Sequence, residues 1–564
     1  MTGRNHITGA EAMVRMLEGY GVKHIFGLCG DTTLPFYDAM ARLDHGITHF
    51  LTRDERHAGY MADGYARVTN RPGVCEGPSG GGATYILPGV VEANESSIPI
   101  LAITTDVATT SSGKYPLTEL DQEALFRPLT KWNGMLSDAA ALPATVRRAF
   151  REMTAGRPGA THLAFPFDTQ KAETPLEAIW VDEAHQSFPA TRSAPDPGAV
   201  SEAAALLSEA RRAVIVCGGG PVISGAEDAL ARLARRLDCP VATTVSGQGA
   251  IAETDPLAVG VVGSNGGVPA TRAVVDDADL VVYVGCRAGS VTTERWRSPA
   301  PGTPIIHIDS DPAVIGANYQ TAVALTGDAR LALAALDAEL DAIGTTARHD
   351  GAARAAKAWE GKLADFLPLA ESTELPIRPE AVVAALMATL PADATIVADP
   401  GTPCPYISAH YRWPTTGRHF ITNRAHGALG FSLAAAMGAH VGRPDVPTVA
   451  LMGDGSFGFA CGEFETLVRY NIPVVSIVFS NATYGWIKAG QDSGFGQRYY
   501  NVDFNRTNHA AVAAAFGVRS WTVSEPSDLQ ATLREALAHD GPTLIDVISQ
   551  PLHEAAAPVS EWVA

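Results

Sequence analysis

The chain has 564 residues, which corresponds to roughly three to four domains of ordinary size. Its 61 acidic residues outnumber its 42 lysines and arginines, and the formal net charge is −19. This balance disfavours nucleic acid and anionic membranes as partners, because both are bound through basic patches. Seven cysteines without a Cys-x-x-Cys pair predict neither a disulfide framework nor a zinc site. We expect a cytoplasmic protein with no signal peptide and no membrane span.

The first predicted element is a helix that begins after Thr8. Thr8 and Glu11 have capping-box spacing, and apolar residues recur at helical spacing over 10–17. Gly21 ends this helix, and the segment 24–31 predicts a strand that runs into a glycine turn. The same order of helix, apolar run and glycine turn recurs along the chain, with apolar runs at 213–220, 278–285, 304–309, 394–401, 448–455 and 473–481.

Apolar strands that alternate with helices predict parallel sheets covered by helices on both faces. Two stretches separate such blocks. Residues 184–199 are rich in Pro and Ser, and residues 343–377 are polar and helical before they become Pro-punctuated. We therefore predict an α/β fold with three doubly wound parallel-sheet domains, at 1–185, 190–345 and 370–564.

The most informative motif lies in the last domain. One predicted strand ends at Gly453-Asp454-Gly455, and another ends at Asn481. Both strand ends lie on the same edge of a parallel sheet, so Asp454 and Asn481 can converge there. A carboxylate and an amide oxygen suit Mg²⁺, and the two glycines let the backbone approach a diphosphate. On its own, Gly-Asp-Gly is also compatible with an ordinary tight turn.

This motif resembles the signature of thiamin-diphosphate (ThDP) enzymes, which begins with Gly-Asp-Gly and ends with Asn-Asn. This chain has Ser480-Asn481 at the end and keeps the second asparagine. Four more segments resemble the family in the same order, and one of them, 307–319, is similar to the central domain of acetolactate synthases and their relatives. The resemblance implies a pyrimidine-binding, a central and a diphosphate-binding domain; the other three segments are 53–74, 79–104 and 421–439.

The resemblance also implies the cofactors and their ligands. Mg²⁺ is expected on Asp454, Asn481 and the carbonyl of Thr483. The ThDP diphosphate is expected against the third domain, with cofactor-binding residues Gly453, Gly455, Ser456 and Thr402. In the central domain, Arg287, Asp309 and Asp311 stand where relatives bind FAD or ADP, and an empty site is the alternative.

Glu55 is the expected acid that activates the ThDP pyrimidine; read without the family, its segment is a solvated polar loop. Leu429 is expected to wedge between the cofactor rings, beside the pyrimidine-binding carbonyl of Gly427, and a core leucine is the alternative. Glu55 belongs to the first domain and the diphosphate to the third. In the family these meet across a subunit interface, so we expect a homodimer or a dimer of dimers.

The residues that would contact substrate depart from the family in several places. Asp31 matches a Gly-Asp pair of simple 2-oxo-acid decarboxylases, but their paired histidines are missing from 105–118. Thr118 stands where acetolactate synthases have glutamine, and Gly490 where they have a substrate-selecting tryptophan, which predicts a larger acceptor pocket. Lys488 either meets an anionic group or is solvated.

Four further residues are lesser candidates. His57, His426 and Cys404 could face the pocket, with a buried histidine or core thiol as the simpler interpretation. The apolar tail around Trp562 could close over the site or dock on the surface.

The function predicted from these features is ThDP- and Mg²⁺-dependent decarboxylation of a 2-oxo acid with carboligation to a second carbonyl. The enzyme would be similar to acetolactate synthase without being a standard one. The first alternative is a 2-hydroxyacyl-CoA lyase or acyl-CoA decarboxylase, acting on an acyl-CoA substrate. The second is a non-catalytic binding protein with the ThDP fold, although Glu55, Asp454 and Asn481 are all present.

Overall fold

The computed structural model describes residues 5–346, 349–555 and 557–559. The chain divides into two compact units, and each is described by itself. Unit 1 comprises Met1–Thr191, Asn423–Asp445 and Ala460–Ile472, and unit 2 comprises Arg192–Thr422, Val446–Phe459 and Pro473–Ala564. The predicted lid around Trp562 lies outside the described residues.

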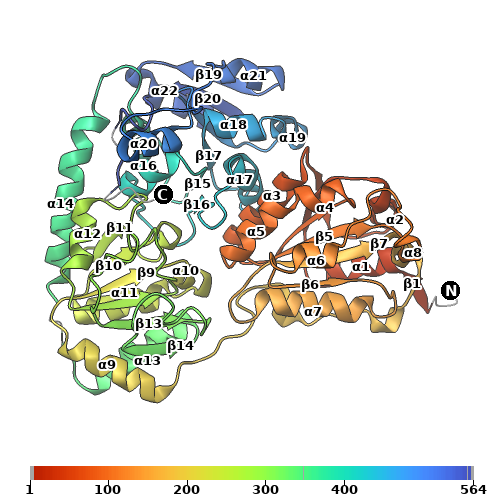
Figure 1. The fold of residues 1–564 in the computed structure, drawn as a ribbon, viewed down its shortest axis with the longest axis horizontal. Helices are drawn as coiled ribbons and strands as arrows, with labels where there is room; N and C mark the ends of the chain where they lie inside the picture. Colours follow the sequence, from red (N-terminus) through yellow and green to blue (C-terminus); the bar gives the residue numbers. More distant parts are fainter. Residues whose placement is uncertain (1–4, 347–348, 556, 560–564) are drawn as a thin grey trace. The chain divides into compact units, whose positions relative to one another are not determined.

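Unit 1 is built on a six-stranded parallel sheet (Figure 1). The chain enters it through the helix α1 (Gly9–Gly19), and the predicted capping box is present, with Glu11 N donating to Thr8 Oγ1 and Thr8 N to Glu11 Oε2. Strand β1 (His6–Thr8), directly before α1 in the sequence, pairs in antiparallel fashion with β8 (Glu173–Pro175). The strands of the sheet, in spatial order, are β3 (Thr48–Leu51), β2 (His24–Gly27), β4 (Gly73–Gly77), β5 (Ile100–Asp106), β7 (Thr161–Pro166) and β6 (Trp132–Met135).

Helices cover both faces of this sheet. The apolar core on one face joins α1 to α2 (Leu34–Arg42) and α7 (Leu142–Thr154). The other face is covered by α3 (Glu55–Thr69) and α5 (Leu87–Glu95). Two helices from late in the sequence, α17 (Phe431–Gly442) and α19 (Glu463–Tyr470), also belong to unit 1. Shorter helices are α4 (Gly81–Tyr85), α6 (Gln122–Phe126) and α8 (Phe167–Lys171).

Helices α3 and α17 pack at backbone distance. A Cβ on Gly64 would lie 2.1 Å from the carbonyl oxygen of Ala435, and one on Gly438 would lie 1.9 Å from that of Met61. Any side chain at either glycine would push the two helices apart, so glycine is required at both. This packing fixes the start of α17, and with it the loop that precedes the helix, against the helix that begins at Glu55.

Unit 2 contains two further six-stranded parallel sheets. In the first, α9 (Pro197–Glu209), α11 (Glu227–Leu237) and α13 (Ala329–Ala342) cover one face, and α12 (Pro269–Asp276) and α14 (Gly351–Ala370) cover the other (Figure 1). A short helix, α10 (Gly220–Ser224), follows its first strand. The strands in spatial order are β11 (Ala258–Val261), β10 (Val241–Thr243), β9 (Ala213–Cys217), β12 (Leu280–Val284), β13 (Ile305–Asp309) and β14 (Val323–Thr326).

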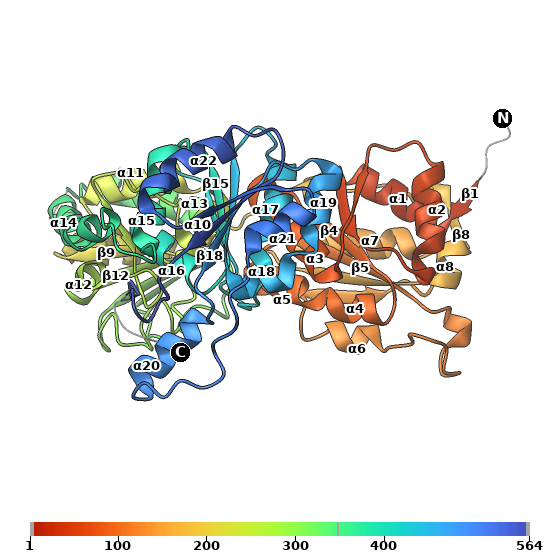
Figure 2. The same cartoon turned by 90° about the horizontal axis from the view of Figure 1, so that it is seen from above.

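In the other sheet of unit 2, α15 (Pro379–Thr389), α16 (Pro403–His410) and α22 (Leu529–Leu537) bury an apolar core. Helix α20 (Gly485–Gly494), labelled in Figure 2, contributes Ala489 to the same core. The remaining helices are α18 (Asp454–Ala460) and α21 (His509–Ala515). The strands in spatial order are β16 (Phe420–Thr422), β15 (Thr395–Ala398), β17 (Thr448–Gly453), β18 (Val475–Ser480), β20 (Thr543–Ile548) and β19 (Arg519–Val523).

Three helix-covered parallel sheets confirm the predicted fold class, and every apolar run singled out in the sequence forms a strand. The stretch 343–377 differs from a simple linker, because most of it is α14, whose Ala355 and Ala358 pack into the core of the first sheet of unit 2. The domain boundaries themselves stay predictions. In the described part of the chain, no helix combines the length and apolar character that a membrane span requires.

Candidate active site

The proposed metal ligands lie together in unit 2. Strands β17 and β18 are neighbours, with Gly453 paired to Phe479, so the loops that follow them start side by side. Asp454 directly follows β17, and its Oδ2 accepts hydrogen bonds from the backbone N–H groups of Asn481 (2.8 Å) and Ala482 (2.5 Å). Its Oδ1 accepts one from Gly455 N at 2.9 Å. The convergence of Asp454 and Asn481 expected from the sequence is thus present in the structure.

The Asp454 carboxylate and the Asn481 side-chain oxygen are both groups that could bind a cation. Asp454 is buried, and burial raises the pKa of its carboxyl group. In the described part of the chain, no group hydrogen-bonds to the buried Oδ1 and Nδ2 of the Asn481 side chain. A buried amide without partners is costly, so an oxygen that is free to bind a metal ion fits this position. Among the described residues, no group of three or more His, Cys, Asp or Glu side chains could hold a metal, and the proposed set contains one carboxylate.

The glycines around Asp454 differ in the space they leave. A Cβ on Gly453 would meet nothing within 4 Å, so the chain leaves room beside this position. A Cβ on Gly455 would lie 2.6 Å from Cε1 of Tyr484, so only glycine fits there. Gly401 also faces open space, and the next residue, Thr402, precedes α16. These open positions fit a cofactor that the backbone approaches closely.

The other predicted residues of this unit occupy the same loops and helices. Ser456 is buried in the first turn of α18, and Thr483 is buried with its hydroxyl donating to the carbonyl of Val502 at 3.0 Å. Lys488 lies on α20 and pairs with Asp503 at 2.9 Å. Lys488 was expected either to meet an anionic group or to be solvated, and the anionic group that it meets in the structure is the chain's own Asp503.

Glu55 begins α3 in unit 1, at the carboxyl edge of the sheet. Its side chain is buried, and burial raises the pKa of the carboxyl group, aided by the nearby Asp54 and Glu76 charges. The glycines of the next loop face it, because a Cβ on Gly77 would lie 3.2 Å from its Cγ and one on Gly82 would lie 3.2 Å from its Oε1. The carboxylate accepts a hydrogen bond from its own backbone N–H, and among described residues no other group donates to it.

The loop that carries Gly427 and Leu429 is held in place by one buried carboxylate. Glu92, on α5, accepts hydrogen bonds from the backbone N–H groups of Ala425 (3.3 Å) and His426 (2.7 Å). Gly427 has a φ of +76° and faces open space, and Leu429 is half-buried. This loop, residues 423–430, leads into α17.

Glu92 was not singled out in the sequence, and neither were its partners. Arg67 binds it at 3.3 Å and also binds Asp63 at 2.8 Å, and all three side chains are buried. The spacing of Asp63 and Arg67 within one helix is a visible signal, whereas their link to Glu92 depends on the tertiary fold. The network joins α3, which begins at Glu55, to the 423–430 loop.

The remaining candidates fall into two groups. His57 is buried and its Nδ1 lies 3.0 Å from Oε1 of Glu463, and Cys404 is buried in a core. His426 and Asp31 are exposed, and Asp31 begins a short turn after β2. Thr118 is exposed and adopts a φ of +71°, which is unusual for a β-branched residue.

In the central segment, where Arg287, Asp309 and Asp311 were expected to mark a nucleotide site, the glycine turn after β9 is closely packed. A Cβ on Gly218 would lie 2.0 Å from the carbonyl of Gly285, and one on Gly220 would lie 2.6 Å from its Cα. These glycines therefore allow two turns to pack closely. Asp309 is buried and accepts a hydrogen bond from Asp311 N at 2.9 Å.

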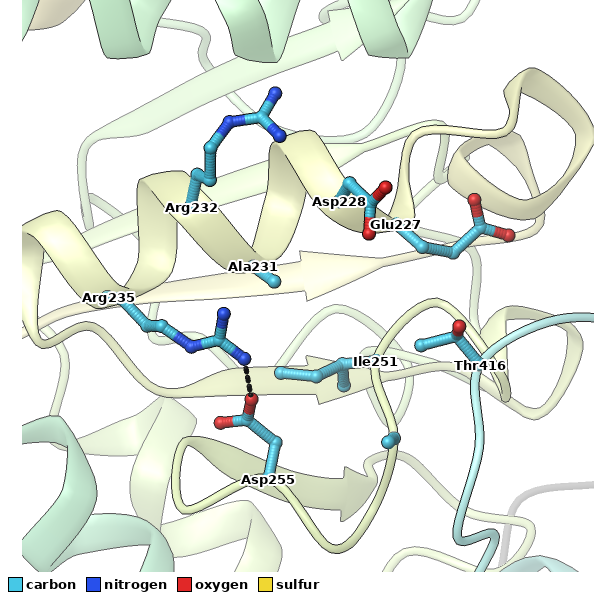
Figure 3. A pocket seen from close by; sticks show the side chains of 9 residues that line it. Glu227, Asp228, Ala231, Arg232, Arg235, Ile251, Asp255 and Thr416 are labelled. Atoms are coloured by element: carbon cyan, nitrogen blue, oxygen red, sulfur yellow. Dashed lines mark hydrogen bonds and ion pairs between the residues drawn. The ribbon is translucent and has the colours of Figure 1, made fainter. Parts of the chain in front are cut away.

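A separate cavity of about 350 Å³ lies on α11. Arg235 and Asp255, which both line it, pair at 2.7 Å. Figure 3 shows this pair and the Arg232 side chain, which points away from it. None of the residues predicted from the sequence lines it. The lining residues are Glu227, Asp228, Ala231, Arg232, Arg235, Ile251, Ala252, Asp255 and Thr416.

Three parts of the chain match the domains of one family. Residues 7–125 match the N-terminal TPP binding domain of thiamine pyrophosphate enzymes, where TPP is another name for ThDP. Residues 200–336 match the central domain of these enzymes, and residues 401–547 match the C-terminal TPP binding domain. The matches follow the order expected from the sequence motifs.

Whole-length relatives carry acetolactate synthase names. The chain is 34% identical over 559 residues to a probable acetolactate synthase large subunit of Methanococcus aeolicus, covering 97% of this chain and 92% of the relative. It is 35% identical to one from Methanocaldococcus jannaschii (96% and 92%) and 30% identical to the isozyme 2 large subunit of Escherichia coli (96% and 95%). These findings confirm the predicted enzyme class and set aside the non-catalytic alternative. The chain belongs to the thiamine pyrophosphate enzyme family, in its acetolactate synthase-like branch, and is a ThDP-dependent enzyme.

Proposed function

We propose that the chain catalyses ThDP- and Mg²⁺-dependent decarboxylation of a 2-oxo acid, followed by carboligation of the retained fragment to a second carbonyl compound. The observation that carries this proposal is the Glu55 carboxyl group, which is buried, has a raised pKa and accepts no hydrogen bond from another described residue. The names of the relatives support the reaction class.

In this proposal, Glu55 hydrogen-bonds to a ring nitrogen of the ThDP pyrimidine and holds a proton there. Its raised pKa favours the protonated carboxyl group, which can donate its proton to that ring nitrogen. When bound, ThDP supplies a carbon nucleophile and takes up the electron pair that decarboxylation releases. Leu429 and the carbonyl of Gly427 orient the pyrimidine, and the Glu92 network keeps their loop in place.

Mg²⁺ would be held by Asp454, the side-chain oxygen of Asn481 and the carbonyl of Thr483. The unpartnered Asn481 amide and the buried Asp454 carboxylate support this assignment. The remaining positions of the octahedron would go to diphosphate oxygens and water, next to the open space at Gly453.

The enzyme would differ from a standard acetolactate synthase in its substrates. Thr118 replaces a glutamine and Gly490 replaces a bulky indole, and both changes remove side-chain volume. Lys488 is paired with Asp503, so it reaches a substrate anion only by exchanging that partner. The proposed acceptor pocket is therefore enlarged, with room for acceptors bulkier than pyruvate as well as for small ones.

Self-association is part of the proposal, as a homodimer or a dimer of dimers. Tyr115 and Leu117 are 97% and 86% exposed, and a second copy of the chain would cover such apolar side chains. Light scattering coupled to size-exclusion chromatography would detect the assembly, and a monomer that is fully active would contradict this part.

The proposal is tested by Glu55→Gln. We expect this variant to fold and to bind ThDP, and to lose turnover by about two orders of magnitude, because acid–base catalysis by a positioned group contributes that much. Glu177→Gln, at an exposed glutamate of the same unit, is the matched control and should keep full activity. Full activity of Glu55→Gln would contradict the proposed role.

The substrate class is tested with wild-type enzyme, ThDP and Mg²⁺. Pyruvate and other 2-oxo acids should release CO₂ and yield ligated products, and chelation of Mg²⁺ by EDTA should abolish both. Turnover of 2-hydroxyacyl-CoA thioesters without turnover of any 2-oxo acid would favour the CoA lyase alternative instead.

A further inference from the structure

Four hydroxyl groups form a continuous hydrogen-bonded chain at the carboxyl edge of the unit 1 sheet. Thr105 Oγ1 lies 2.7 Å from Thr32 Oγ1, which lies 3.1 Å from Ser79 Oγ, which lies 2.7 Å from Thr118 Oγ1. The backbone N–H of Ser79 also donates to Thr32 Oγ1 at 3.1 Å. Thr105 is buried in β5 and Thr118 is exposed, so the hydroxyl chain runs from the core to the surface.

The direction of these hydrogen bonds follows from counting protons, because each hydroxyl donates only once. Thr118 donates to the carbonyl oxygen of Leu117. Ser79 must therefore donate to Thr118, Thr32 to Ser79, and Thr105 to Thr32. Every donor points outward, and the exposed Thr118 oxygen keeps a free acceptor position. A ligand at this end must therefore supply a donor.

The hydroxyl chain shares its loop with the proposed catalytic acid. Gly77 and Gly82 face the Glu55 side chain, and between them Gly80 approaches Thr118, since a Cβ on Gly80 would lie 2.7 Å from Cβ of Thr118. The φ of Thr118 is +71°, a strained conformation for threonine that the surrounding contacts must enforce. Thr118 and Glu55 thus both lie against the short loop 77–82.

Three acidic residues flank members of the hydroxyl chain in the sequence, Asp31, Asp106 and Glu119. Negative charges nearby would disfavour a carboxylate or phosphate and would tolerate a hydroxyl or a cationic donor. An aldehyde that carries a free amine condenses with itself, so a hydroxyl is the donor that fits the proposed carbonyl acceptor. A hydroxyl can also donate to the free position on Thr118, as the proton count requires.

We propose that Thr118, oriented by Ser79, Thr32 and Thr105, binds a hydroxyl group of the acceptor substrate, so that the enzyme prefers hydroxyl-bearing aldehydes to their deoxy counterparts. This inference rests on the proposed carboligation and adds the chemical class of the acceptor. Thr118 acts here as a specificity-determining residue.

The test compares glycolaldehyde with acetaldehyde, which differ by one hydroxyl, as competing acceptors with pyruvate as donor. The wild-type enzyme should favour glycolaldehyde in kcat/KM. Thr118→Val should reduce that preference by roughly 3- to 10-fold, as expected for one hydrogen bond. Ser79→Ala should reduce it in the same direction, and Thr118→Ser, which keeps the hydroxyl, should retain it. Thr145→Val, on the outer face of α7, is the control that should change nothing.

The outcomes separate this inference from the proposed function. Absence of CO₂ release from any 2-oxo acid by wild-type enzyme would overturn the proposed function, and the acceptor inference with it. CO₂ release with the same acceptor preference in wild type and Thr118→Val would overturn the acceptor inference alone. Saturation-transfer NMR with hydroxyacetone, against acetone, which lacks the hydroxyl, gives a second readout that needs no turnover. Equal signals for both ketones in the wild type would likewise contradict a hydroxyl site.

Discussion

Glu92→Gln tests whether one buried carboxylate positions the loop 423–430. Glu92 accepts hydrogen bonds from the Arg67 guanidinium, from Ser96 Oγ at 2.7 Å and from two backbone N–H groups of the loop. Glutamine has nearly the same shape, but it removes the charge and replaces one acceptor oxygen by an NH₂ group. The single oxygen of glutamine can accept hydrogen bonds either from the loop or from Arg67 and Ser96. The donors of the other set then meet the NH₂ group, which is itself a donor.

The size of the effect follows from burial. Breaking a buried ion pair by removing one partner costs about 3–5 kcal/mol. A buried backbone N–H that loses its acceptor costs about 1–3 kcal/mol. We expect the free energy of unfolding to fall by about 3 kcal/mol in Glu92→Gln. If about 1.4 kcal/mol of this loss appears as loop ordering that ThDP must restore, its Kd rises about tenfold.

Isothermal titration of ThDP at saturating Mg²⁺ measures this Kd, and chemical denaturation measures stability. Glu95→Gln is the matched control, because Glu95 ends the same helix and its carboxylate accepts a hydrogen bond from the neighbouring Asn94 side chain. A variant that loses stability but binds ThDP as tightly as the wild type would show that Glu92 is merely structural. That result would refute the positioning argument.

Two further predictions concern buried charges. Lys362 is buried over the Trp359 ring at 3.8 Å and interacts with the buried Glu253. Lys362→Met should lower the free energy of unfolding, measured by chemical denaturation, by about 3–5 kcal/mol, and adding Glu253→Gln should restore most of that loss. Equal stability of the single and the double variant would contradict the pairing. Burial raises the pKa of Asp106 to about 6, so the folded state binds the proton more tightly than the unfolded chain, and stability is lost as pH rises through that value. Asp106→Asn should therefore raise the melting temperature more at about pH 7.5 than at about pH 4.5, and a pH-independent difference would contradict this.

The strand ends of the last domain were predictable because the signal is local. An apolar run followed by Gly-Asp-Gly marks the end of a buried strand, and parallel pairing brings the next strand end beside it. Asp454 and Asn481 therefore meet in the structure as the sequence predicts. Their roles as Mg²⁺ ligands stay predictions, supported by the unpartnered Asn481 amide.

Other features could not be predicted because they join segments distant in sequence. Glu92 meets residues 425 and 426 only because α17 packs on α3, and that packing depends on two glycines that look ordinary in the sequence. The stretch around Lys362 reads as a polar linker, since the burial of its charge is set by a sheet formed elsewhere in the chain. The local sequence pattern predicts neither the contact of Glu92 with the loop nor the burial of Lys362.

The hydroxyl chain of unit 1 lies between these two cases. Its members follow or end neighbouring strands, since Thr32 comes after β2, Ser79 after β4 and Thr105 lies near the end of β5. The rule that brought Asp454 and Asn481 together applies equally to these strands. What the rule cannot supply is the direction of the hydrogen bonds, which depends on Thr118 and on a backbone conformation that threonine rarely adopts. That direction leaves an acceptor at the surface, and under the acceptor proposal above the exchange of the Thr118 hydroxyl for a methyl group of similar size should weaken the preference for hydroxyl-bearing acceptors.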